Sequence, residues 1–204
     1  MPSVSQGFSS LAPLERRAIA RRAFVNSLPV LMGYLTMGFA AGVLLSVKAL
    51  IPCAPLWSAI IAFSAISGTL SFAIVPAIAA SDPFYSIAVL TFAINFRYAF
   101  YGFSMLGRWR GIPLLQKWFL VHSLADEIYA LDVACRLPDP RKNRLYCLWN
   151  HALCTGYWVI GSTAGALAGA ALPIPSRGIE FAMVALFLVI FTDQMKGRLH
   201  RHAL

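Results

Sequence analysis

Long apolar runs, separated by short basic or proline-containing stretches, dominate this chain. The runs span about residues 24–47, 56–80, 84–106, 114–134, 145–172 and 179–193. Several of them reach about 20 residues, the length that a helix needs to cross the hydrocarbon core of a bilayer. The pattern therefore predicts an all-α fold, a polytopic membrane helix bundle of about six membrane segments.

The third run carries Arg97 near its middle, where a charge costs about 2.5–3.5 kcal/mol on insertion scales. Helical periodicity divides this run into three faces. They hold Arg97, Tyr101 and Ser104; Thr91, Asn95, Tyr98 and Gly102; and Phe92, Phe96 and Phe103 with Ala99. We expect the phenyl face to meet lipid or a partner subunit and the Arg97 face to be interior. Arg97 then either pairs with a neighbouring helix and locks the fold, or marks a substrate or ion pathway.

Two carboxylates lie centrally within an apolar run and can offset this charge: Asp126 and Glu127. Their run, 114–134, is too polar for a lipid-exposed helix, while its opposite face is too apolar for a surface loop. It predicts a helix packed in the bundle with its acids turned inward. We therefore predict that Arg97 lies near Asp126 or Glu127, directly or through a hydroxyl such as that of Tyr101.

The middle of the second run is small and hydroxylic. Ser67, Gly68, Thr69 and Ser71 cluster at membrane depth, and Pro76 follows. Such a cluster is typical of a broken helix whose freed backbone groups line a cavity. The alternative is ordinary small-residue packing with a proline kink. The second and fourth runs are the candidates for broken segments or for segments that enter the membrane and return.

Glycines recur four residues apart in the first and fifth runs, a spacing that permits close helix approach. They are Gly38 and Gly42 in the first run and Gly161, Gly165 and Gly169 in the fifth. We expect the three glycines of the fifth run to lie at a close helix–helix contact.

The fifth run also places Cys147, His151 and Cys154 on one stripe. Because three soft ligands on a single helix enclose a metal only partly, we interpret the stripe as packed small residues with a hydrogen-bonded histidine. The four cysteines show no CxxC or CxxxC spacing, so neither a disulfide framework nor a zinc knuckle is indicated. No cofactor is predicted.

Charge gives the orientation of this 204-residue chain, which is 59% hydrophobic and carries a formal net charge of +9. We expect a basic cytoplasmic N-terminal segment (1–23), a transmembrane domain (24–193) and a basic cytoplasmic tail (194–204). Six crossings place eleven Lys/Arg inside and five outside; if the second and fourth runs re-enter, the numbers are fourteen and two. The positive-inside rule slightly favours re-entry, but six crossings are the first choice. The charge indicates contact with anionic headgroups and not with nucleic acid, because no soluble basic domain is present.

Several local motifs together resemble the AzlC family over roughly residues 24–195. They are SLPV at 27–30, GFAAG at 38–42, SGTLSF at 67–72, NFRYAFYGFS at 95–104, DE at 126–127 and DQ at 193–194. The resemblance implies the large subunit of a branched-chain amino acid exporter in a bacterial cell (inner) membrane. It also implies a small AzlD-type membrane subunit as partner.

The chemistry of the polar residues suits such a substrate, a zwitterion with an apolar side chain. Arg97 suits the carboxylate, and Asp126 or Glu127 suits the ammonium. The candidate substrate-binding residues are Arg97, Asn95, Tyr101, Asp126, Glu127, Ser67, Gly68 and Ser71. Many family members place a glutamine where this chain has Ser71.

Two other classes of function compete with transport. An intramembrane enzyme needs a constellation such as HExxH or GxSxG, and the sequence contains neither. A truncated, non-transporting assembly subunit is the alternative, because family members usually continue with further C-terminal hydrophobic segments. The sequence leaves the carried amino acid and the driving ion open.

Overall fold

Seven α-helices make up the part of the chain that the computed structural model describes, residues 12–48, 52–171 and 181. They are α1 (Pro13–Lys48), α2 (Ala54–Ala65), α3 (Gly68–Ala79), α4 (Phe84–Met105), α5 (Leu114–His122), α6 (Asp126–Ala134) and α7 (Pro140–Ala171). The all-α prediction is confirmed. Apart from residue 181, the sixth apolar run, 179–193, and the tail, 194–204, lie outside the described residues.

Among the described helices, α1 alone is both long and apolar enough to cross a membrane by length and composition, over Pro13–Val47. It begins earlier than the expected residue 24 and continues through Pro29. α4 has the necessary length at 22 residues, but Asn95 and Arg97 make it less apolar. The predicted second run appears instead as two shorter apolar helices, α2 and α3.

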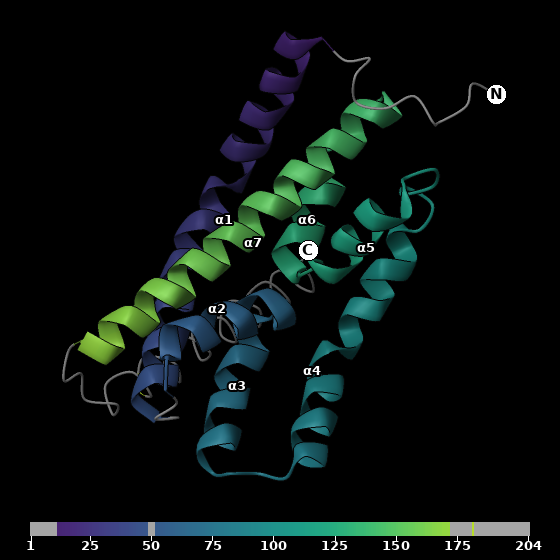
Figure 1. Ribbon diagram of the computed structural model, residues 1–204. Coiled ribbons are helices and arrows are strands. Elements are labelled where there is room, and N and C mark those ends of the chain that lie inside the picture. Colours follow the sequence, from purple (N-terminus) through teal and green to yellow (C-terminus); the bar gives the residue numbers. More distant parts are fainter. Residues whose placement is uncertain (1–11, 49–51, 172–180, 182–204) are drawn as a thin grey trace, which may run out of the picture.

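α1 and α7 run side by side and parallel (Figure 1). Near their starts, Lys142 Nζ lies 2.6 Å from Glu15 Oε1, and further along the rings of Tyr34 and Trp158 are 5.5 Å apart. Near the end of α1, Ser46 Oγ donates to the carbonyl of Ala166 at 2.7 Å. Both helices therefore begin at the same end of the bundle.

Glycines bring the backbones of α1 and α7 together. A Cβ atom at Gly165 would overlap the carbonyl group of Phe39, and one at Gly42 would overlap the backbone of Ser162. At Gly161 a Cβ would meet the backbone of Leu35 at 3.0–3.1 Å, tighter than ordinary van der Waals contact. The prediction of a close contact at the glycines of the fifth run is confirmed.

α2 and α3 form a helical hairpin that enters the bundle and leaves by the same end. Ser58 of α2 donates to Ser162 of α7 at 3.0 Å, and Ala62, one turn on, packs near Trp158, earlier in α7. α3 then returns toward the C-terminal end of α1, where Val75 packs in a cluster that includes Leu44. At the tip, Ile66 adopts a φ of 27°, which β-branched residues rarely do.

α5 and α6 form a second hairpin, which enters from the opposite end, where α1 and α7 begin. Gln116 of α5 accepts a hydrogen bond from Arg144 at the start of α7 (2.7 Å), and Ala125 at the tip packs in the cluster of Tyr34. α6 then returns, and Cys135 just after it packs near Ile19 of α1. The second and fourth runs are thus broken and reverse. This corrects the expectation of six full crossings for these two segments, because hydropathy alone does not give the direction of a half-length helix.

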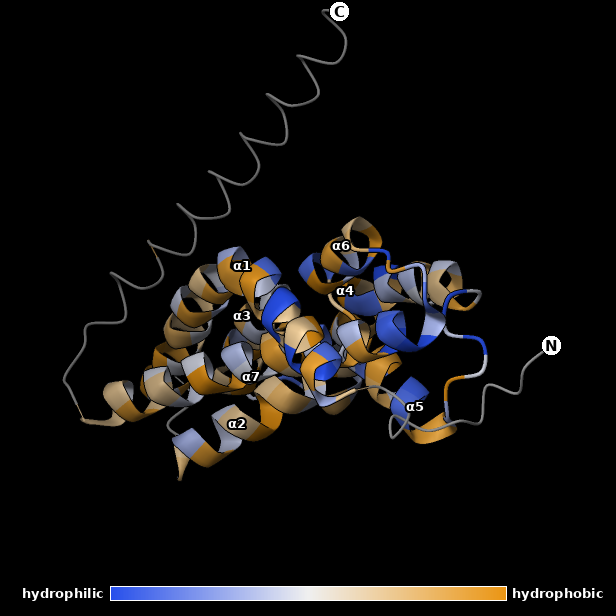
Figure 2. Cartoon of the chain, turned by 90° about the horizontal axis from the view of Figure 1, so that it is seen from above, coloured by the Kyte–Doolittle hydropathy of each residue, from blue (hydrophilic) through white to orange (hydrophobic). Residues whose placement is uncertain are grey.

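α4 joins the two ends of the bundle and stands at its side (Figure 1). It begins after α3 and ends at Met105, which packs near Ile19 and Ala23 of α1. Phe92, Phe96 and Phe103 are all exposed, as predicted for a face that meets lipid or a partner. Hydrophobic residues cover most of the helices, whereas hydrophilic ones gather toward α5 and α6 (Figure 2).

Candidate functional site

The tips of the two hairpins meet in the middle of the bundle. His122 Nε2, at the end of α5, lies 2.8 Å from the carbonyl oxygen of Phe63 in α2. Beside this contact is a cavity of about 500 Å³. Its walls come from both tips and from α1, α4 and α7: Tyr34, Met37, Ile66, Gly68, Thr69, Arg97, Tyr98, Tyr101, Ala125, Asp126, Glu127 and Trp158.

An ion pair crosses this cavity. Arg97 Nη1 of α4 lies 3.0 Å from Asp126 Oδ2 of α6, so the predicted pairing is confirmed and is direct. The two side chains remain 42% and 36% exposed, because they lie on the cavity wall and not in a closed interior. The arginine face of α4 therefore lines a cavity, as the division of that helix into faces predicted, but it is not sealed.

Tyrosine hydroxyls hold Arg97 and Glu127 in place. Arg97 Nη2 donates to the Tyr98 hydroxyl at 3.2 Å, and that hydroxyl donates to Ser67 Oγ at 3.2 Å. On the other wall, the Tyr34 hydroxyl donates to Glu127 Oε2 at 2.9 Å. Arg97 and Glu127 are thus oriented by partners from α4, from the N-cap of α3 and from α1.

Two helix N-termini face the same space. α3 starts at Gly68 after Ser67, whose Oγ accepts from the amide of Leu70 at 3.3 Å, and α6 starts at Asp126. The free amide groups of a helix N-terminus carry a partial positive charge that favours anions. The amide groups at the start of α3, together with Arg97, make that side of the cavity suited to a carboxylate. On the opposite side, the acidic side chains of Asp126 and Glu127 suit a cation.

The predicted site residues separate into three groups. Five line the cavity: Arg97, Tyr101, Asp126, Glu127 and Gly68. Ser67 is buried behind them and acts through Tyr98. Asn95 and Ser71 are not among the lining residues; Ser71 donates to the carbonyl of Ser67 at 3.0 Å and faces α1 and α7.

Residues that sequence reasoning missed form the apolar and aromatic wall. Tyr34, Met37 and Trp158 belong to α1 and α7, whose apolar pattern gave no signal that distinguishes a cavity wall from packing. Tyr98 did carry a signal, since it directly follows Arg97 and lies on the neighbouring face of the same helix.

A second cavity of about 460 Å³ lies between α4 and α6, nearer the end where α1 and α7 begin. Arg108 and Arg136 are on its wall together with Ser104 and Tyr129. The rings of Tyr101 and Tyr129 stack at a centroid distance of 4.6 Å, one ring on the wall of each cavity. A stacked tyrosine pair therefore separates the two cavities.

Comparisons with known proteins agree with this picture of a membrane protein. Residues 29–172 match the model of the family described as AzlC protein. An uncharacterized membrane protein of Haemophilus influenzae is 34% identical over 187 residues, 91% of this chain and 75% of that protein. The branched-chain amino acid transport protein AzlC of Bacillus subtilis is 29% identical over 188 residues, 92% of this chain and 72% of that protein. No solved structure matches the chain.

Proposed function

The chain belongs to the AzlC family, and we propose that it exports branched-chain amino acids across the membrane. The family is one of membrane transport proteins and not of enzymes, so transport is the general function. The substrate, the direction and the partner are the parts that we add. The observation that carries the proposal is the Arg97–Asp126 pair at 3.0 Å in a cavity between two broken segments.

The cavity matches a zwitterion with an apolar side chain. Arg97 offers a guanidinium for the substrate carboxylate, near the N-terminus of α3, and Asp126 with Glu127 offers acceptors for its ammonium. Met37, Ile66 and Trp158 supply apolar surface for a branched side chain. A volume of about 500 Å³ lies within the range of small-molecule sites.

The two members of the ion pair can exchange each other for the charged groups of the substrate. When substrate enters, its carboxylate replaces Asp126 as the partner of Arg97, and its ammonium replaces Arg97 as the partner of Asp126. Neither charge is then left uncompensated inside the bundle, which would be costly. Movement of the Tyr101–Tyr129 stack would connect this site to the second cavity and so to one side of the membrane.

Charge and the family support the proposed direction of transport and the proposed membrane. The Arg-rich start of α1 and the basic stretch that leads into α7 lie at one end of the bundle, which we assign to the cytoplasm. The second cavity would then be the cytoplasmic entrance for export. We further propose that the chain lies in a bacterial inner membrane and works with a small AzlD-type subunit.

Efflux of labelled leucine from proteoliposomes, with and without the small subunit, tests this proposal. Arg97→Ala and Asp126→Ala should each abolish efflux, because each leaves one end of the zwitterion unpaired. Two exposed charges outside the cavity, Arg110→Ala and Asp82→Ala, serve as matched controls and should keep wild-type efflux.

Two outcomes would overturn the proposal. Wild-type efflux in folded Arg97→Ala and Asp126→Ala variants would remove these residues from the site. Absence of leucine, isoleucine or valine flux in the wild-type chain with its small partner would favour the non-transporting assembly subunit instead.

A further inference from the structure

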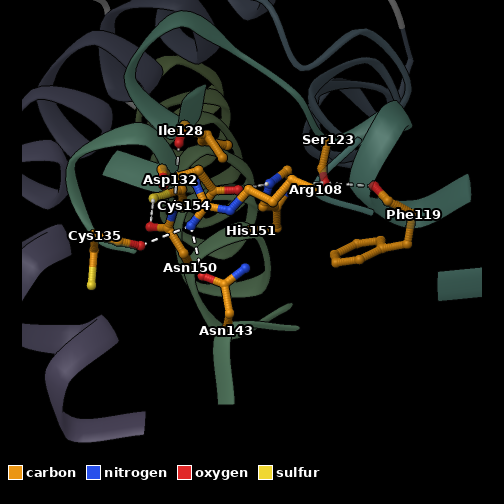
Figure 3. Close-up of polar contacts among 10 residues, drawn as sticks. All are labelled: Arg108, Phe119, Ser123, Ile128, Asp132, Cys135, Asn143, Asn150, His151 and Cys154. Atoms are coloured by element: carbon orange, nitrogen blue, oxygen red, sulfur yellow. Dashed lines mark hydrogen bonds and ion pairs between the residues drawn. The ribbon is translucent and has the colours of Figure 1, made fainter. Parts of the chain in front are cut away.

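Asp132 of α6 and His151 of α7 form a second acid–base pair (Figure 3), and neither residue lines the cavity. His151 Nε2 of α7 is 3.2 Å from Asp132 Oδ2, and both side chains are 0% exposed. Asn150 Nδ2 donates to the other carboxylate oxygen, Asp132 Oδ1, at 2.9 Å. The interpretation of His151 as a hydrogen-bonded histidine is confirmed.

The hydrogen bonds around His151 fix where its protons are. Ser123 Oγ donates its single proton to the carbonyl of Phe119 at 2.6 Å. At its 2.7 Å contact with His151 Nδ1, Ser123 must therefore accept, so Nδ1 carries a hydrogen. The contact between Nε2 and Asp132 Oδ2 then needs one further proton, since without it two lone pairs would face each other.

The surrounding elements supply other titratable groups, and besides His151 the Asp132 carboxylate has two neutral hydrogen-bond partners, Asn150 and the thiol of Cys147. Arg108, in the turn after α4, donates to the backbone carbonyls of Asp132 and Cys135 and to Asn143 Oδ1, and its charge lies near the pair. α7 contributes the thiols of Cys147 and Cys154 and the hydroxyl of Tyr146. The thiol of Cys135 lies just after α6. α5, which the structure describes in full, contributes no ionisable group to this network. Asp132 and His151 thus share one exchangeable proton.

The α5–α6 hairpin carries residues of both this network and the cavity wall. Ser123 is the C-cap of α5 and belongs to the hairpin tip that leads into Asp126. Asp132 stands on the same nine-residue helix as Asp126 and Glu127. A movement of the α5–α6 hairpin that opens the cavity therefore also shifts Asp132 and Ser123 relative to His151.

We propose that Asp132 and His151 form a proton-binding site that couples proton movement to the α5–α6 hairpin. When the hairpin opens toward one side, the proton leaves to water and an Asp132 carboxylate and a neutral His151 with Nδ1–H remain. When it opens toward the other side, one proton from water restores the pair. This inference rests on the proposed function, since it names the proton as the driving ion for transport.

Proton flux measured with a pH-sensitive dye in proteoliposomes tests the coupling. Asp132→Asn keeps the shape and can still donate to Nε2, but it cannot release a proton. It should abolish substrate-coupled proton flux, while exchange of labelled for unlabelled substrate, which moves no net proton, persists. Cys154→Ala is the matched control, because Cys154 touches Asn150 in the same network and lacks the shared proton; it should keep the coupled flux.

Coupled proton flux in folded Asp132→Asn protein would overturn the proposal. Loss of coupled flux in both Asp132→Asn and Cys154→Ala would also do so, because the network would then be purely structural.

A spectroscopic measurement separates this inference from the transport proposal. In detergent, ¹⁵N shifts of His151, assigned with His151→Gln, and the ¹³C shift of the Asp132 carboxyl should show Nδ1 protonated at every pH. One proton shared by Nε2 and Asp132 should be lost as pH rises, with no such step in Asp132→Asn. A bare Nδ1, or no titration of the pair, would refute the proton count. A titrating pair in a chain that moves no substrate would refute the transport proposal instead.

Discussion

α7 and α4 are both long helices, yet the bundle holds them in opposite ways. Thirteen residues of α7 are buried, and its glycines let the backbone of α1 approach closely. In α4, all of whose residues are described, Met105 alone is buried, and most of the helix stands at the side of the bundle with phenyl rings outward. The arginine of the candidate site is on the loosely held helix.

This difference divides the molecule into a frame and moving parts. α1 and α7 bury enough surface to act as one rigid unit, whereas elements with few buried contacts open at low cost. α4 and the two half-helix hairpins, which carry Arg97, Gly68 and Asp126, are the elements that must shift if a substrate is to pass. Transporters of this kind commonly rock one set of helices against a fixed frame around a central site.

The largest expected effect is on the frame. Gly165→Leu should destabilise the protein by more than about 3 kcal/mol, because its side chain collides with the backbone of Phe39, which no rotamer change relieves. Gly156→Leu on the same helix is the control, since a Cβ there meets nothing within 4 Å. Thermal unfolding in detergent measures both. Equal melting temperatures for the two variants would contradict the assignment of α1 and α7 as the frame.

The next effect is expected at Met105, the one buried residue of α4. Met105→Ala removes a buried side chain from the cluster with Ile19 and Trp109 and should cost about 2–5 kcal/mol. Phe103→Ala, two residues earlier and exposed, should cost about 0.5 kcal/mol or less. The comparison uses the same unfolding measurement. A larger loss at Phe103 would show that α4 is held from its outer face, by lipid or a partner, and not by its end.

The sequence predicted those features that depend on local composition. The all-α class, the break at Ser67–Gly68 and the glycine contacts follow from periodicity, small polar residues and missing side chains. The Arg97–Asp126 pair was predictable because so few charges exist within the apolar runs that one acid had to lie near the one arginine.

The features that the sequence did not predict depend on direction and on distant contacts. A half-length apolar helix has the same hydropathy whether it crosses or returns, so hydropathy left the reversal of the hairpins open and the count of Lys and Arg favoured it only slightly. Tyr34 and Trp158 are far apart in the chain and become one cavity wall only through the parallel packing of α1 and α7. Asp132 lies near a segment end in the sequence, but the return of α6 along α7 buries it beside His151.

The smallest expected effect on stability concerns the ion pair of the cavity itself. A fully buried pair typically loses about 3–5 kcal/mol when one member is removed. Arg97 and Asp126 are 42% and 36% exposed to the cavity, so water screens the charge that a single substitution leaves behind. We therefore expect Arg97→Ala and Asp126→Ala each to cost about 1 kcal/mol of unfolding free energy, while both abolish efflux. The double variant should be more stable than either single one, because it leaves no lone charge. The three variants form a double-mutant cycle that gives the coupling energy between Arg97 and Asp126. A coupling energy of about 3–5 kcal/mol would mean that the site is closed to water and opens only when α4 moves. No coupling at all would mean that the two side chains meet without stabilising each other, and the exchange of partners proposed for substrate entry would lose its basis.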